Sequence, residues 1–195
     1  MALLHYITHP QVVVDPAVAV PRWGLSPVGR ERAERMTTRA WVGAVRRIVS
    51  SDETKALETA ELLAAALDLG VEVRAATGEI DRSAAGFLPP VEFEAVADAC
   101  FADPTSSARG WERAVDAQQR IVEALADVVA DDRPGDVAVV GHGGVGTLWY
   151  CHLAAVPIAR RWDQPGQGHV FTVDRLTGRP LDHWRPIDTD VDRRP

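Results

Sequence analysis

Two histidines follow hydrophobic segments that have the character of buried strands. His9 comes directly after residues 3–8 (LLHYIT), and His142 comes directly after residues 136–141 (DVAVVG). In an open parallel sheet, ligands bind beyond the carboxyl ends of the strands. We therefore expect the two imidazoles to lie close together and to form a nucleophilic or proton-transfer centre.

Further polar groups follow the other expected strands. Lys55 falls in the first turn of a predicted helix, and the glycine-rich residues 143–146 begin another helix directly after His142. Free N–H groups at a helix N-terminus favour an anion. Two imidazoles, an ammonium and N–H donors suit a tetrahedral oxyanion such as a phosphoryl group. Glu79, after a third strand, is the candidate acid for the leaving oxygen, and Asp81 is the alternative.

A metal site is a competing interpretation of the same residues. His9, His142 and Glu79 are all residue types that bind divalent metals, but no local HxH or HExxH spacing supports such a site. We therefore predict no metal and no other cofactor.

The elements that must position these groups alternate between strands and helices. Strands are predicted at residues 3–8, 48–49, 71–73, 137–140, 169–174 and 181–185. Helices are predicted at residues 27–45, from a capping box at Ser50 and Glu53 to Gly70, near 92–101, at 111–130 and at 144–154. This alternation predicts an α/β three-layer sandwich with a mostly parallel central sheet.

The chain length of 195 residues fits one domain with a sizeable core. We predict a single domain over residues 1–188, in which residues 76–110 form a cap insertion over the site. Residues 189–195 are expected to be a flexible tail. Trp23 lies near the site in sequence and is expected to shape the pocket.

Composition restricts the partners. The formal net charge of −7 argues against nucleic acid and anionic membranes, but it permits a phosphorylated small molecule bound by local cations. No apolar stretch reaches about 18 residues, so no membrane span is expected. The N-terminal residues lack a basic segment, and Cys100 and Cys151 have no CxxC spacing, so we expect reduced thiols and a cytoplasmic location. The oligomeric state stays open.

The order of the motifs resembles the histidine phosphatase superfamily, which has the phosphoglycerate-mutase-like fold. The segments that carry the resemblance are Thr8-His9-Pro10, where the family has Arg-His-Gly, residues 23–33 (WGLSPVGRERA), residues 50–60 (SSDETKALETA), Glu79, and residues 139–145 (VVGHGGV). The resemblance extends over about residues 3–175. It implies that His9 is transiently phosphorylated, that His142 contacts the phosphoryl group, and that Glu79 protonates the leaving oxygen. Gly143 and Lys55 would help to bind the phosphoryl group.

Two residues depart from the family pattern. Thr8 replaces the arginine next to the nucleophile, and Lys55 replaces a phosphate-binding arginine with a point charge. A charge-assisted hydrogen bond contributes about 1.5–3 kcal/mol, so its loss lowers the rate about tenfold to a hundredfold unless Arg30 or Arg82 compensates.

The sequence thus predicts a metal-independent phosphatase of reduced activity that hydrolyses a phosphomonoester. Two alternatives stay open. One is a protein that binds a phosphate ester without turnover, and the other is a phosphomutase. The short, proline-interrupted cap at residues 76–110 favours hydrolysis, because a mutase must exclude water.

Overall fold

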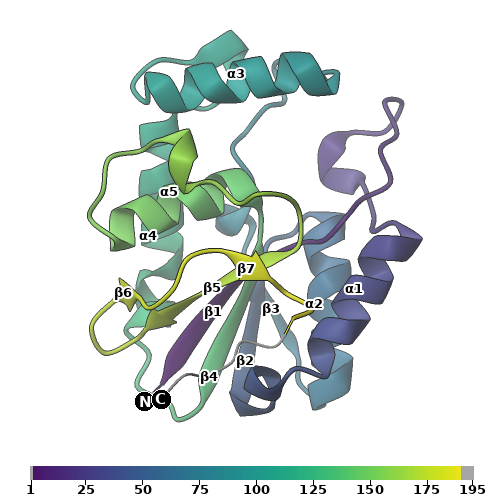
Figure 1. Cartoon of the computed structure of the whole chain (residues 1–195), viewed down its shortest axis with the longest axis vertical. Coiled ribbons are helices and arrows are strands. Elements are labelled where there is room, and N and C mark those ends of the chain that lie inside the picture. The colour runs from purple at the N-terminus through teal and green to yellow at the C-terminus, as the bar shows by residue number, and fades with distance from the viewer. Residues whose placement is uncertain (1, 190–195) are drawn as a thin grey trace.

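The computed structural model describes residues 2–189, and a seven-stranded sheet lies at its centre (Figure 1). The strands are β1 (Leu3–Thr8), β2 (Val45–Ser50), β3 (Val71–Val73), β4 (Asp136–Gly141), β5 (His169–Asp174), β6 (Arg179–Pro180) and β7 (Arg185–Pro186). Their order is β3-β2-β4-β1-β5-β6, and β7 also pairs with β5. The first four strands pair in parallel, whereas β5 runs antiparallel to β1. The predicted mostly parallel sheet is confirmed.

Alternation along the buried strands divides the core into two layers. Ile7 and Ile48 point to the face covered by α1 (Pro27–Thr37) and α2 (Thr54–Leu67). Tyr6 and Val49 point to the opposite face, which α4 (Ala114–Val129) and α5 (Gly143–Leu153) cover. Successive side chains of a strand point to opposite faces, so continuous apolar strands bury both sides of the sheet. The predicted three-layer sandwich is confirmed.

The cap is built on α3 (Pro90–Ala102), which lies beyond the carboxyl ends of the parallel strands and apart from the sheet (Figure 1). A separate hydrophobic cluster holds it, in which Phe101 and Cys100 of α3 pack near Trp111 and Leu148. The α3 segment thus has its own hydrophobic cluster, anchored to the start of α4 and to the middle of α5. Cys100 and Cys151 are both buried and free.

The prediction of one helix over residues 27–45 is wrong for the residues after Thr37. Helix α1 ends at Thr37, and a 3-10 helix follows at Ala40–Ala44 before β2 begins at Val45. Trp41 and Val42 are buried in the core next to α2, and a continuous α-helix would carry the chain past the start of β2. Tertiary packing therefore overrides the helical periodicity of this segment.

Two other local predictions are also wrong. Ser50 is the last residue of β2, and α2 begins at Thr54 with Glu53 as an N-cap residue that makes no side-chain cap bond. The predicted capping box is therefore absent, because the Glu53 side chain is used elsewhere. The strand predicted at residues 181–185 is replaced by the two-residue strands β6 and β7 on either side of it.

Five 3-10 helices complete the elements of the described part of the chain, and besides Ala40–Ala44 they are Val20–Arg22, Ala75–Thr77, Ala108–Gly110 and Arg160–Trp162. The predicted tail falls, from residue 190 onward, outside the described residues. Among residues 2–189, no helix combines the length and the apolarity that a membrane crossing requires.

Candidate active site

His9 directly follows β1 and is fixed by its own backbone. Its N–H donates to the Gly141 carbonyl at the end of β4 (3.1 Å), and its carbonyl accepts from the Gly168 N–H (3.0 Å). The ring Nδ1 lies 2.9 Å from the Pro10 carbonyl oxygen, which can only accept a hydrogen bond. The Nδ1 proton is therefore held there, and Nε2 carries the free lone pair of the imidazole.

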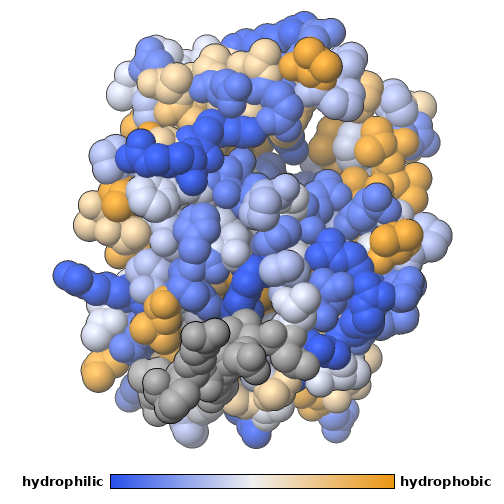
Figure 2. Space-filling view, in the orientation of Figure 1, coloured by the Kyte–Doolittle hydropathy of each residue, from blue (hydrophilic) through white to orange (hydrophobic). Residues whose placement is uncertain are grey.

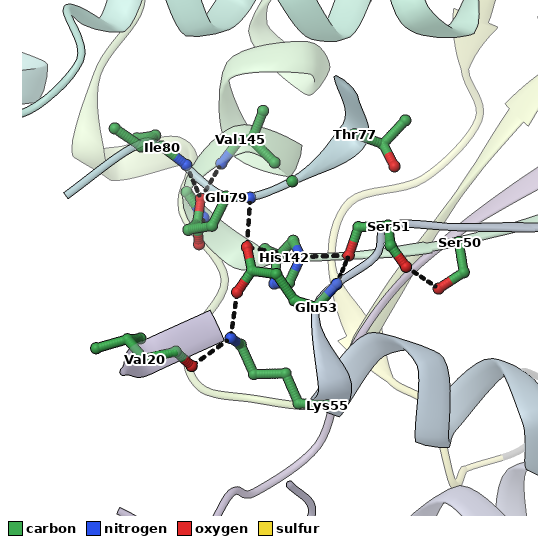
Figure 3. Close-up of polar contacts among 12 residues, drawn as sticks. Val20, Ser50, Ser51, Glu53, Lys55, Thr77, Glu79, Ile80, His142 and Val145 are labelled. Atoms are coloured by element: carbon green, nitrogen blue, oxygen red, sulfur yellow. Dashed lines mark hydrogen bonds and ion pairs between the residues drawn. The ribbon is translucent and has the colours of Figure 1, made fainter. Parts of the chain in front are cut away.

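His142 lies behind His9, as the two strand ends predict. The centroids of the two rings are 5.4 Å apart at an interplanar angle of 63°. The Ser51 hydroxyl oxygen accepts from the Glu53 N–H at 3.4 Å, and it lies 2.7 Å from His142 Nε2 (Figure 3). A hydroxyl can act as donor or acceptor toward Nε2, and the other ring nitrogen of His142 is Nδ1. That nitrogen is buried and has no hydrogen-bond partner within residues 2–189.

Both imidazoles are held neutral. Burial, with His142 adding to it, lowers the pKa of His9 to about 3. Burial also lowers the pKa of His142, although the neighbouring carboxylates of Glu53 and Glu79 oppose the shift. At neutral pH the His9 lone pair is therefore available to an electrophile without prior deprotonation.

Lys55 is a buried cation in the first turn of α2, and it forms an ion pair with an acidic side chain. Its Nζ donates to the Val20 carbonyl at 3.1 Å and to Glu53 Oε2 (Figure 3). Glu53 Oε1 accepts from the Glu79 N–H at 2.9 Å and lies 3.4 Å from His142 Nε2. Burial raises the pKa of Glu53, but His142 and Lys55 outweigh it and lower that pKa to about 2. The cation predicted to bind phosphate is thus paired with an internal carboxylate.

Glu79 occupies the helix N-terminus that the sequence predicts to be free for an anion. Its Oε1 accepts from the N–H groups of Ile80 (2.9 Å) and Val145 (2.8 Å), and its Oε2 accepts from the Gly144 N–H (3.1 Å). Burial raises the pKa of Glu79, but Arg82, His142 and these N–H donors outweigh it, so the net shift is downward. The expectation of several free N–H donors is therefore corrected. At the start of α5 only the Gly143 N–H makes no hydrogen bond to another described residue.

Thr8 is fully buried and contacts Gln164 instead of facing the cavity. Its hydroxyl donates to Gln164 Oε1 at 2.6 Å and accepts from the His169 N–H at 2.9 Å. The Gln164 amide nitrogen lies over Gly143, at a place that any Cβ on this glycine would overlap. It makes no hydrogen bond to another residue of the described range 2–189. Thr8 therefore orients an amide donor toward the site.

A cavity of about 590 Å³ opens above these groups, under the cap (Figure 2). Of the predicted site residues, His9, Lys55, Glu79, Arg82 and Gly143 line it, together with Trp23. The other predicted residues do not line the cavity: His142 and Thr8 are fully buried beneath it, whereas Arg30 and Asp81 are exposed. Of the two arginines expected to compensate for Thr8, the structure brings only Arg82 to the site.

Sequence reasoning missed three residues of this site: Ser51, Glu53 and Gln164. Ser51 and Glu53 lie inside segment 50–60, which carries the family resemblance. An acidic residue two positions before Lys55 could have indicated an ion pair, but Glu53 was interpreted as part of a capping box. Gln164 had no sequence signal, because it comes from a loop and meets Thr8 only through the fold.

The arrangement suits attack by an imidazole on a phosphoryl group. It has a neutral imidazole with a fixed tautomer, a second imidazole whose buried Nδ1 contacts no described hydrogen-bonding group, one ammonium, and one amide donor. Positioning and charge neutralisation are most of what phosphoryl transfer requires of a protein. No group of three or more His, Cys, Asp or Glu side chains with the geometry of a metal site occurs among the described residues.

Solved structures with the same fold include several phosphatases. The mycobacterial glucosyl-3-phosphoglycerate phosphatase aligns with a TM-score of 0.79 at 23% identity, over 95% of this chain and 99% of its own. Phosphoserine phosphatase from Entamoeba histolytica aligns at 0.78 and 17% identity, covering 97% and 100% of the two chains. YhfR from Bacillus stearothermophilus gives 0.76 and 22%, covering 98% of each chain. A comparison with curated proteins finds no match.

A family profile identifies the chain more directly than these distant structures. The profile of the histidine phosphatase superfamily (branch 1) matches residues 20–183, which is most of the sequence. The matched range contains Lys55, Glu79 and His142, and the fold adds His9 to them at the same sheet edge. The chain belongs to branch 1 of the histidine phosphatase superfamily.

Proposed function

We propose that the protein is a phosphatase that hydrolyses a phosphomonoester through a phosphohistidine on His9, without a metal ion. One observation carries the proposal: the Pro10 carbonyl holds the His9 Nδ1 proton, which leaves a neutral Nε2 facing a cavity that also contains Lys55. The low pKa of His9, about 3, keeps this nitrogen nucleophilic throughout the physiological range.

In the first step, the Nε2 lone pair of His9 attacks phosphorus and the bond from phosphorus to the alcohol oxygen breaks. The departing oxygen takes a proton from Glu79. In the second step, water attacks the phosphohistidine, its proton returns to Glu79, and phosphate leaves His9 as the free imidazole. His142 Nδ1–H, Lys55 and the Gln164 amide donate to the phosphoryl oxygens during both steps.

The acid role of Glu79 requires that its pKa rise when substrate binds. In the empty site the carboxylate is ionised, because Arg82, His142 and backbone N–H groups lower its pKa despite burial. A phosphoryl dianion beside it disfavours a second negative charge and raises that pKa. Asp163 is a second candidate for the acid, since burial raises its pKa and it lines the same cavity.

The test is to trap the phosphoenzyme. The protein is incubated with a ³²P-labelled phosphomonoester or acetyl phosphate and quenched in alkali, and acid-labile label is measured for wild type, His9→Ala and the control His152→Ala. His152 is exposed on α5 and does not line the cavity. We expect label on wild type and on the control, and none on His9→Ala. Hydrolysis by His9→Ala at the wild-type rate would refute the proposal.

A non-catalytic phosphate-ester-binding protein is the second candidate, and the Lys55–Glu53 ion pair favours it. An internal carboxylate on the one lysine of the site reduces the charge stabilisation available to a phosphoryl transition state. Calorimetry that shows tight binding of a phosphate ester with no phosphate release would establish this alternative. Release of phosphate that requires His9 would exclude it.

A further inference from the structure

The cavity above the phosphoryl site has the size of a pocket for a complete organic ligand. Its volume of about 590 Å³ falls within the range of about 300–1,000 Å³ that is usual for small-molecule sites. His9, Lys55 and Gly143 occupy only its floor, so most of the space faces the alcohol part of a substrate. The walls of this upper part therefore decide which alcohols fit.

Aromatic side chains from two separate segments form these walls. Trp23, from the loop after β1, contacts Phe87 of the cap, with ring centroids 5.9 Å apart. Phe93 of α3 contacts Trp111, with ring centroids 5.5 Å apart. Aliphatic and aromatic side chains also line the cavity, namely Val12, Val14, Val20, Leu88 and Phe101. Figure 2 shows hydrophobic side chains beside the hollow below α3.

Two arginines of the upper cavity contact other described side chains. Arg160 pairs with Glu94 on α3 and also lies 3.3 Å from Asp163. The Arg82 guanidinium carbon lies 5.0 Å from the Phe93 ring centroid and 5.4 Å from that of Trp111. The carbon surface of the aromatic and aliphatic walls cannot replace the water around the hydroxyls of a sugar or polyol. A hydroxyl that loses its water without gaining a partner binds unfavourably.

We propose that the substrates are phosphomonoesters of apolar alcohols that carry a ring, held between the Trp23–Phe87 pair and the Phe93–Trp111 pair. This inference rests on the proposed function, because it assigns the leaving group of that reaction. Burial of one ring against such walls contributes about as much binding free energy as burial of a Phe side chain contributes to folding. This corresponds to about a tenfold to hundredfold gain in affinity.

The test compares two primary alkyl phosphates, so that the intrinsic reactivities of the leaving groups are similar. We expect 2-phenylethyl phosphate to have a kcat/KM at least tenfold above that of glycerol 1-phosphate. Phe87→Ala should lower kcat/KM for the phenyl substrate about tenfold more than it lowers kcat/KM for glycerol 1-phosphate. The matched control is Val91→Ala, on the outer side of α3 at 84% exposure, which should change neither substrate. Equal values for the two substrates, or a preference for glycerol 1-phosphate, would overturn the inference.

A binding measurement separates this inference from the proposed function. Calorimetry on the wild type with 3-phenylpropylphosphonate and 3,4-dihydroxybutylphosphonate, which imitate the two substrates without being hydrolysed, requires no turnover. Tighter binding of the phenyl compound, lost in Phe87→Ala, would support the substrate class even if no ester is hydrolysed. Equal or weaker binding of the phenyl compound would refute the class, whereas hydrolysis of any ester through His9 would leave the proposed function intact.

Discussion

Thr8 illustrates how a single replacement changes the partners of a site. The family pattern has an arginine at this position, whereas the shorter Thr8 side chain is fully buried. Its hydroxyl instead donates to Gln164 Oε1 at 2.6 Å, which turns the amide nitrogen of that residue toward Gly143. In the mechanism proposed above, this amide is a neutral hydrogen-bond donor where the family pattern supplies a guanidinium, whose charge-assisted bonds are stronger.

Removal of the Gln164 amide should weaken binding of orthovanadate or phosphate. We expect Gln164→Leu to raise Kd about tenfold, since a hydrogen bond to a charged group contributes about 1.5–3 kcal/mol. Thr8→Val should raise Kd by a smaller factor. The double variant should have the Kd of Gln164→Leu alone, because both changes act on the same Gln164 amide. Calorimetric titration measures all three, with the exposed Gln119→Leu as the control. Additive losses in the double variant would contradict the coupling.

At the scale of elements, α1 fixes the segment that follows the nucleophile. The Gln11 carbonyl accepts from the Ser26 N–H at 2.9 Å, and Val12 forms an isolated bridge with Leu25. Gly29 lies in the first turns of α1 directly against the Gln11 backbone, where a Cβ would overlap the carbonyl oxygen. The glycine of segment 23–33 is therefore required for the close approach of this helix to residues 10–12.

Gly29→Ala should destabilise the protein, although alanine is normally the better helix former by about 0.5–1 kcal/mol. The overlap with a backbone atom forces α1 or residues 10–12 to move, and overpacking of this kind costs about 1–3 kcal/mol. Denaturant unfolding measures the change in the free energy of unfolding. The control is Gly43→Ala, at a position where no atom lies within 4 Å of the new Cβ, and it should be nearly neutral. Equal stabilities of the two variants would refute the packing role.

For the whole molecule, the buried imidazoles connect the site to stability. The native pKa values of His9, about 3, and of His142 are both lowered by burial, whereas unfolded histidines titrate near 6.5. Below that pH the unfolded chain binds protons that the native state excludes, so the free energy of unfolding falls as the pH falls. For His9 this loss continues down to about pH 3. Protonation of Glu53 also lowers the free energy of unfolding at more acidic pH, because its native pKa is about 2.

Stability should therefore decrease from pH 7 to pH 5, with a slope of up to about 1.4 kcal/mol per pH unit for each buried imidazole. His9→Asn removes one of these groups and should make the slope between pH 6 and pH 5 shallower. The exposed His152→Asn should leave it unchanged. Denaturant unfolding at each pH gives the slopes, and equal slopes for wild type and His9→Asn would show that His9 does not exclude its proton.

The sequence by itself determined the α/β sandwich, the order of the motifs and the convergence of His9 and His142. These depend on apolar runs and glycine positions that act locally, and the sheet then brings its strand ends together. Only the tertiary structure placed the Glu53 carboxylate on the Glu79 N–H, Glu79 on the start of α5 and Gln164 beside Thr8. It also shortened the helix predicted at residues 27–45 and replaced the strand predicted at 181–185. Such partners are chosen by packing between segments that are distant in the chain, and no local pattern encodes that choice.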